Sequence, residues 1–262
     1  MKAVVLGSGQ DGGVPQLLGP DRDERSASSV AVVTDDGAIL LDCAPDVRRQ
    51  HRALTSAIGD DAARIAAVAL THGHMGHYAG LVHFGKEAAA TTEIPLYGTR
   101  SMIRFLESNE PWATLFRNRN LVVGSTTFEI GGVKGEAIPV PHRSELTDAV
   151  AWSISDDETR LLYLPDIDSW DAWPNAADVI GSHDVALLDA SFFDEDEPLG
   201  RPISEIPHPL VVDTLERFRA ADCRVVLTHL NHTNALARGD ADAHARVAAA
   251  GWEVAFDGMV IE

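Results

Sequence analysis

Residues 72–77 constrain this chain more than any other segment, because they place three histidines directly after a short apolar run. Residues 66–70 are apolar, and Thr71 is followed by His72, Gly73, His74, Met75, Gly76 and His77. A short apolar run that ends abruptly in polar residues predicts a buried strand followed by a loop. Imidazole nitrogen is a good ligand for Zn, Fe, Mn or Ni, so the cluster indicates a metal site rather than a solvated histidine-rich loop.

Further candidate ligands follow later apolar runs in the same way. His142 follows residues 137–141, Asp166 follows 161–165, and His229 follows 225–228. Each of them alone would suit an ordinary buried histidine or a turn aspartate. Because each lies just past an expected strand, we expect all of them to meet the histidine cluster at one site.

The chain resembles the metallo-β-lactamase superfamily, whose signature in this setting is H-x-H-x-D-H, and the resemblance runs from end to end. Within the superfamily it is most similar to the branch that holds the PQQ-biosynthesis B protein and tRNase Z. Similarity to the first lies in residues 6–8 with 12–16, 44–46, 229–234 and 256–259. The resemblance implies an α+β fold: an αββα sandwich of two mixed β-sheets with helices on both outer faces, built as one domain over residues 1–262.

The superfamily pattern also implies a set of metal ligands. The first metal would be held by His72, His74 and His142, the second by His77 and His229, and Asp166 would bridge the two. Gly76 occupies the position of the aspartate that normally completes the second site. That site would then bind weakly, recruit another ligand or stay empty.

Asp166 and His208 are the candidate catalytic residues. The tRNase Z branch has a histidine between the aspartate after a strand and the last ligand, where it acts as a proton donor, and His208 resembles it. The alternative for His208 is a solvent-exposed histidine at a helix start. His232 would lie near His229 as a supporting residue or a replacement ligand.

The chain departs from the PQQ-biosynthesis pattern in two ways. Residues 17–25 hold no cysteine, whereas that family has a cysteine cluster there, and that family lacks the full histidine set that this chain keeps. The similarity is therefore to a PQQ-B-like protein.

Charge and composition bear on partners and location. The net charge of −19 would repel polyanions, so nucleic acid is not an expected partner and a small-molecule substrate is. No apolar run approaches the length of a membrane-spanning helix, and no membrane partner is expected. Two cysteines far apart, Cys43 and Cys223, suit a reducing cytoplasm. A homodimer is compatible with these features.

Local patterns predict strands at residues 2–6, 29–34 and 38–41 and a helix over 78–90. Three loops are candidates for the walls of a pocket: residues 7–25, residues 109–120 with Arg117 and Arg119 as anion ligands, and residues 192–209.

These observations favour a metal-dependent hydrolase that acts on a small ester, lactone, thioester or phosphodiester. One or two Zn ions, with Fe or Mn as alternatives, would lower the pKa of a bound water to about 7 and yield a metal-bound hydroxide. The resemblance implies an alternative, an iron-dependent oxygenase acting on a modified amino acid or peptide. A second alternative is a non-catalytic binding protein with a degenerate site, which Gly76 favours.

Overall fold

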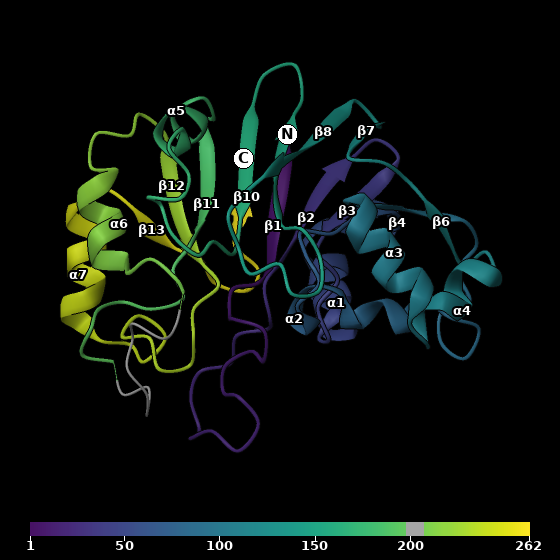
Figure 1. The fold of residues 1–262 in the computed structure, drawn as a ribbon, viewed down its shortest axis with the longest axis horizontal. Helices are drawn as coiled ribbons and strands as arrows, with labels where there is room; N and C mark the ends of the chain where they lie inside the picture. Colours follow the sequence, from purple (N-terminus) through teal and green to yellow (C-terminus); the bar gives the residue numbers. More distant parts are fainter. Residues whose placement is uncertain (198–206) are drawn as a thin grey trace.

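Two mixed β-sheets packed face to face form the centre of the protein (Figure 1). The computed structural model describes residues 1–197 and 207–262. In this part of the chain the first sheet has seven strands in the order β14-β1-β2-β3-β4-β5-β6. These are β14 (Val260–Ile261), β1 (Lys2–Gly7), β2 (Ser29–Thr34), β3 (Gly37–Leu41), β4 (Ile65–Ala69), β5 (Ile94–Tyr97) and β6 (Leu121–Val123).

The second sheet also has seven strands in the described residues, in the order β13-β12-β11-β10-β9-β8-β7. These are β13 (Glu253–Val254), β12 (Arg224–Thr228), β11 (Val185–Asp189), β10 (Arg160–Leu164), β9 (Val150–Ser155), β8 (Val133–Pro139) and β7 (Thr127–Ile130). Strands β3 to β6 are parallel in one sheet, and β10 to β13 are parallel in the other. The carboxyl ends of parallel strands share one edge, so each sheet offers one row of strand-end loops.

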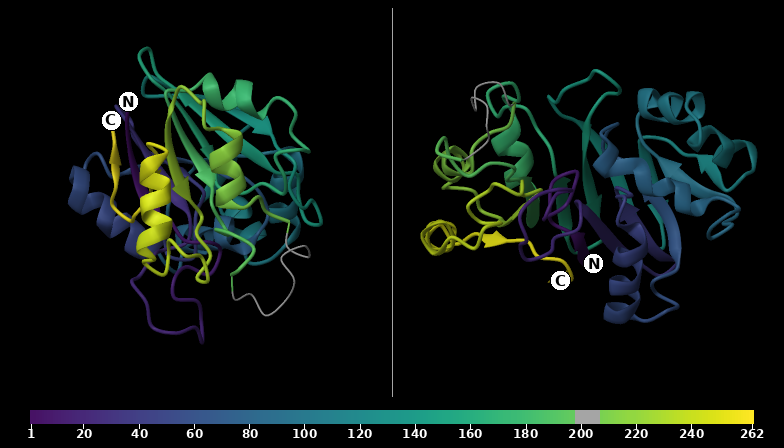
Figure 2. Two further views of the ribbon diagram at one scale, coloured as in Figure 1. Left: turned by 90° about the vertical axis from the view of Figure 1, so that its left-hand side faces the viewer. Right: turned by 90° about the horizontal axis from the view of Figure 1, so that it is seen from below.

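Helices cover both outer faces (Figures 1 and 2). Over the first sheet lie α1 (Val47–Ile58), α2 (Met75–Tyr78), the 3-10 helix η1 (Ala79–Phe84), α3 (Arg100–Ser108) and α4 (Trp112–Arg117). Over the second lie α5 (Ala176–Gly181), α6 (Val211–Arg217) and α7 (Ala241–Ala249). The αββα sandwich predicted from the sequence is confirmed.

Three apolar layers hold these elements together. Side chains between the sheets, including Ile39, Trp152 and Leu187, form the central core. Leu40 and Leu54 pack in the layer between the first sheet and its helices. A third cluster fills the space between the second sheet and α5 to α7. A strand that is buried on both faces has apolar residues at successive positions. This is why β3, β10 and β11 are recognisable as apolar runs in the sequence.

The helix predicted over residues 78–90 is confirmed only as far as Phe84, and most of it is a 3-10 helix. The chain forms a short α-helix that ends at Tyr78 and then the 3-10 helix η1. The backbone is diverted because Cys43 N donates to His77 O at 2.8 Å and Gly80 N donates to Cys43 O at 3.0 Å. A Cβ atom at Gly80 would lie 2.1 Å from Ala44 O. The carbonyl of His77 and the N–H of Gly80, which an α-helix would use for its own hydrogen bonds, are therefore bonded to Cys43 instead.

In the part of the chain that the structure describes, no helix is both long and apolar enough to cross a membrane.

Trp152 links the second sheet to the segment that carries the histidines. Its side chain is fully buried, and its Nε1 donates a hydrogen bond to Leu70 O at 3.0 Å. We predict that Trp152→Phe lowers the free energy of unfolding by about 1–3 kcal/mol, because a buried carbonyl loses its partner and a void opens. Urea denaturation measures this as a fall in midpoint at constant m.

The matched control is Val123→Ala, at a half-exposed position of the edge strand β6. It should change the free energy of unfolding by less than about 0.5 kcal/mol. A Trp152→Phe protein as stable as this control would contradict the role given to Trp152.

Candidate metal centre

The histidines and aspartates singled out in the sequence meet where the strand-end loops of the two sheets face each other. His72, His74 and His77 follow β4, His142 follows β8, Asp166 follows β10, and His229 follows β12. His74 precedes α2 in extended conformation, and His77 lies within α2. The structure therefore brings together the whole predicted ligand set from segments far apart in the sequence.

One group of ligand atoms consists of imidazoles from His72, His74 and His142 with the carboxylate of Asp166. His74 Nδ1 lies 2.9 Å from His72 Nε2 and 3.2 Å from His142 Nε2. Asp166 Oδ2 lies 3.5 Å from His72 Nε2 and 3.2 Å from His142 Nε2. A tetrahedron with metal–ligand bonds of about 2.1 Å has edges of about 3.4 Å, so these donors fit a Zn-sized ion.

A second group consists of Asp11, His77 and His229, whose ligand atoms all lie within 4.8 Å of one another. Asp11 Oδ1 lies 3.2 Å from His77 Nε2. Asp11 Oδ1, His77 Nε2 and His229 Nε2 are buried and have no hydrogen-bond partner among the described residues. Buried polar atoms without partners are costly, and three that face one space fit a bound cation.

Asp166 lies between the two groups. Its Oδ2 belongs to the first group and is also 3.8 Å from His229 Nε2. A carboxylate in this position can face two cations at once, as the superfamily pattern implies for Asp166.

A buried carboxylate behind the second group orients His77. Asp42 is fully buried, and its Oδ2 lies 2.7 Å from His77 Nδ1. Asp42 also accepts hydrogen bonds from Thr71 N at 2.8 Å and from the Tyr163 hydroxyl at 3.2 Å. The Nδ1 proton of His77 is thereby held toward Asp42, and its Nε2 is left toward the site.

Oxygen atoms also lie behind His142 and His229. Asp168 Oδ1 lies 2.8 Å from His142 Nδ1, and Ser191 Oγ lies 2.9 Å from His229 Nδ1. His74 differs, because its Nδ1 faces the site and its Nε2 lies 3.5 Å from Glu145. Each ring is thus presented through one defined nitrogen.

Burial and charge together set the protonation of Asp166 and His72 in the first group. Burial opposes the charge on Asp166, but the facing imidazoles, His208 first among them, outweigh it and hold the pKa of Asp166 well below its usual value. Burial and the nearby charge of His77 lower the pKa of His72 well below its usual value. An ionised carboxylate and a neutral imidazole are the forms that bind metal.

His208 is buried beside this centre. Its Nδ1 lies 2.9 Å from Asp189 Oδ2 and 3.3 Å from Asp166 Oδ1. Burial opposes its charge, but these two carboxylates outweigh burial and raise the pKa of His208 to about 9. Burial likewise opposes ionisation of Asp189, but His208 outweighs it and lowers the pKa of Asp189 to about 2. The solvent-exposed alternative for His208 does not hold, and its role as a proton donor stays a prediction.

Sequence reasoning missed Asp11 and Asp42. Asp42 ends a buried strand as the other candidates do, so the strand-end pattern would have found it. Asp11 does not follow an apolar run. Its position next to the glycines of loop 7–25 was the only feature of the sequence that pointed to it. His232, considered as a replacement ligand, belongs to neither group of ligand atoms.

The other expected pocket loops contribute less. Residues 109–120 contain α4, and Arg117 and Arg119 pair with neighbouring glutamates at exposed positions, which leaves neither as an evident anion ligand. The prediction for loop 192–209 falls largely on residues 198–206, which lie outside the described residues.

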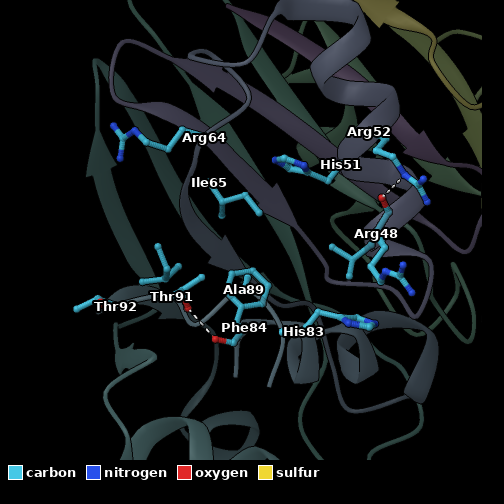
Figure 3. Close-up of a pocket in the computed structure, with 13 residues that line it drawn as sticks. Arg48, His51, Arg52, Arg64, Ile65, His83, Phe84, Ala89, Thr91 and Thr92 are labelled. Carbon is cyan, nitrogen blue, oxygen red and sulfur yellow. Dashed lines mark hydrogen bonds between the residues drawn. The ribbon is translucent and has the colours of Figure 1, made fainter. Parts of the chain in front are cut away.

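A cavity of about 750 Å³ lies apart from this centre, between α1, η1 and the start of β5 (Figure 3). Its charged and titratable lining residues are Arg48, Arg52, Arg64, His51 and His83. Among the described residues no carboxylate lines it, and its two histidines belong to neither group of ligand atoms. The cavity therefore does not have the donors of a metal site.

Comparison with known proteins places this geometry in a family. The beta-lactamase superfamily domain matches residues 38–255, so the chain belongs to this superfamily, as the sequence resemblance predicted. It is 28% identical to coenzyme PQQ synthesis protein B of Cupriavidus necator, over 98% of each chain.

Solved structures share the fold. Zn(2+)-bound PqqB from Methylobacterium extorquens matches with a TM-score of 0.84 and 24% identity over 100% of both chains. A diphosphatase from the PhnP family matches with a TM-score of 0.69 and 23% identity, over 100% of this chain and 97% of that one. The αββα architecture is therefore common to all three.

We predict that Asp42→Asn weakens zinc binding at His77 by about 10- to 100-fold, the usual effect of losing a carboxylate behind a ligating histidine. Asparagine keeps the shape, but its amide nitrogen cannot accept the Nδ1 proton of His77. Competition with a chromophoric chelator measures the affinity of the protein for each equivalent of zinc. Asp60→Asn, at an exposed position, is the matched control and should bind like the unmodified protein. Equal affinities in the two variants would refute the orienting role of Asp42.

Proposed function

We propose that this protein is a metal-dependent hydrolase acting on a small ester, lactone, thioester or phosphodiester. The observation that carries the proposal is the pair of adjacent ligand groups, with Asp166 of the first group 3.8 Å from His229 of the second. Hydrolysis of such substrates needs a polarised substrate oxygen and an activated water, and a pair of adjacent cation positions serves both.

Each ligand residue would bind one of the two metals, except Asp166, which would bind both. His72, His74 and His142 would hold the first metal, His77 and His229 the second, and Asp166 both. A divalent ion bound here would act as a Lewis acid and acidify its water. Imidazoles with carboxylates suit Zn, Fe and Mn, and zinc is supported by its presence in the similar PqqB structure.

His208 would supply the leaving-group proton. A histidine whose pKa is raised to about 9 carries its proton at neutral pH. Asp189 fixes the ring through Nδ1, and Nε2 has no hydrogen bond to any described residue. His208 is therefore held in the protonated form, beside Asp166, with one nitrogen available as an acid.

The substrate class follows from charge and from similarity. The strongly negative chain does not favour a polyanion such as RNA. Similarity to a PhnP-family diphosphatase supports small phosphate esters as the first substrates to screen.

An oxygenase is the second candidate. Three imidazoles with one carboxylate suit Fe(II) about as well as Zn(II). The full-length similarity to coenzyme PQQ synthesis protein B favours a role of this kind. Oxygen consumption by protein loaded with Fe(II) under air, with candidate modified amino acids or peptides, separates it from hydrolysis.

We predict that His72→Ala lowers hydrolysis of bis(p-nitrophenyl) phosphate or p-nitrophenyl acetate by at least about 100-fold and removes one equivalent of metal, because the first position loses a ligand. Mass spectrometry for metals and a colorimetric assay give both values. The matched control is His83→Ala, in the separate cavity, and should retain metal and activity. Full activity in metal-depleted protein would contradict the proposal.

We predict that His208→Gln lowers kcat by about 10²- to 10⁴-fold for substrates with a poor leaving group, since these need a proton on departure. A p-nitrophenolate group leaves without one, so its hydrolysis should fall far less. Metal content should not change. An equal loss for both kinds of substrate would argue that His208 only supports the structure.

A further inference from the structure

The space of the side chain missing at Gly76 is filled by Asp11. A Cβ atom built on Gly76 would lie 2.4 Å from both Cα and Oδ1 of Asp11 and 2.9 Å from its Cβ. Real Cβ atoms essentially never come closer than 3.0 Å to such neighbours. Asp11 in its present place and a side chain at residue 76 therefore exclude each other.

The Asp11 carboxylate also faces the partners that a ligand in this place would need. Its Oδ1 is 3.2 Å from His77 Nε2 and belongs to one group of ligand atoms with His229 Nε2. The carboxylate is partly exposed overall, but Oδ1 is buried and accepts no hydrogen bond from the described residues. A buried carboxylate oxygen aimed at two unpartnered imidazole nitrogens completes a cation site of three protein donors.

Backbone hydrogen bonds fix Asp11 to the strand end that carries His229. Leu230, the next residue after His229, donates from N to Ser8 O at 2.9 Å and accepts at O from Gln10 N at 2.9 Å. The base of the N-terminal loop is thus paired with the segment after β12. The rest of this loop extends away from the sheets (Figures 1 and 2).

We propose that Asp11 is the carboxylate ligand of the second metal position and replaces the side chain missing at Gly76. This inference rests on the proposed metal centre and says which part of the chain completes it. The donor comes from the N-terminal loop instead of the segment with the three histidines. Metal at the second position therefore ties the loop base to α2 and to the end of β12.

Single substitutions at both positions test the proposal. The variants are Asp11→Asn, Asp11→Gly and Gly76→Asp. Asp23→Asn, at an exposed position of the same loop, is the matched control. Zinc binding to each purified, metal-free protein is measured by calorimetry and by competition with a chromophoric chelator. The equivalent bound through His72, His74 and His142 reports on folding in every variant.

We expect two equivalents in the unmodified protein and in Asp23→Asn. Asp11→Asn and Asp11→Gly should keep the first equivalent and lose at least about 10- to 100-fold in affinity for the second. Gly76→Asp alone should melt at a lower temperature and gain no affinity, because its side chain meets Asp11.

Other outcomes separate the two proposals. Two equivalents with unchanged affinities in both Asp11 variants would overturn the role of Asp11 and leave the metal centre intact. No metal binding by the unmodified protein would overturn the metal centre and the role of Asp11 together.

Hydrogen exchange gives a second readout that does not depend on affinity. Zinc at the second position should slow exchange in peptides covering residues 8–14 of the unmodified protein. Asp11→Asn keeps the loop but lacks the carboxylate, so zinc should protect these peptides much less in this variant. Equal protection in both proteins would contradict the proposal.

Discussion

The centre depends on one fully enclosed carboxylate, Asp166, which faces imidazoles from both sheets. A buried charge is costly unless it is closely paired, and Asp166 is paired on several sides. Other groups in turn orient the imidazoles of the centre: the buried carboxylate of Asp42 contacts His77, and that of Asp189 contacts His208. The two sheets must meet with their strand ends together for this set of charges to be compensated, so fold and site depend on each other.

Much of this arrangement could be predicted from the sequence, because a buried strand followed by a ligand is a local pattern. It located His142, Asp166 and His229, and the apolar runs located β1, β2 and β3 to within one residue. The helix expected over residues 78–90 was confirmed only as far as Phe84 and mostly as a 3-10 helix, since backbone contacts with Cys43 divert the chain. Asp11 was also beyond local patterns, because its relation to Gly76 exists only once the N-terminal loop packs against α2.

The position of Asp11 weakens the case for a non-catalytic binding protein. The hypothesis of a non-catalytic binding protein drew on the absent side chain at Gly76, and that space now holds a carboxylate facing His77 and His229. The second metal position then takes its carboxylate from the N-terminal loop and not from residue 76. Hydrolysis and oxidation differ in what they require of this position: a hydrolase of this design gains from a second cation, whereas an Fe(II) oxygenase needs only the first.

The interpretation of this protein depends on two cation positions that flank Asp166. Anomalous diffraction from crystals soaked in Zn(II), recorded on both sides of the zinc edge, can locate both ions. We expect two peaks, one among His72, His74 and His142 and one among Asp11, His77 and His229, with Asp166 between them. A single peak at the first group, or none at either, would contradict it.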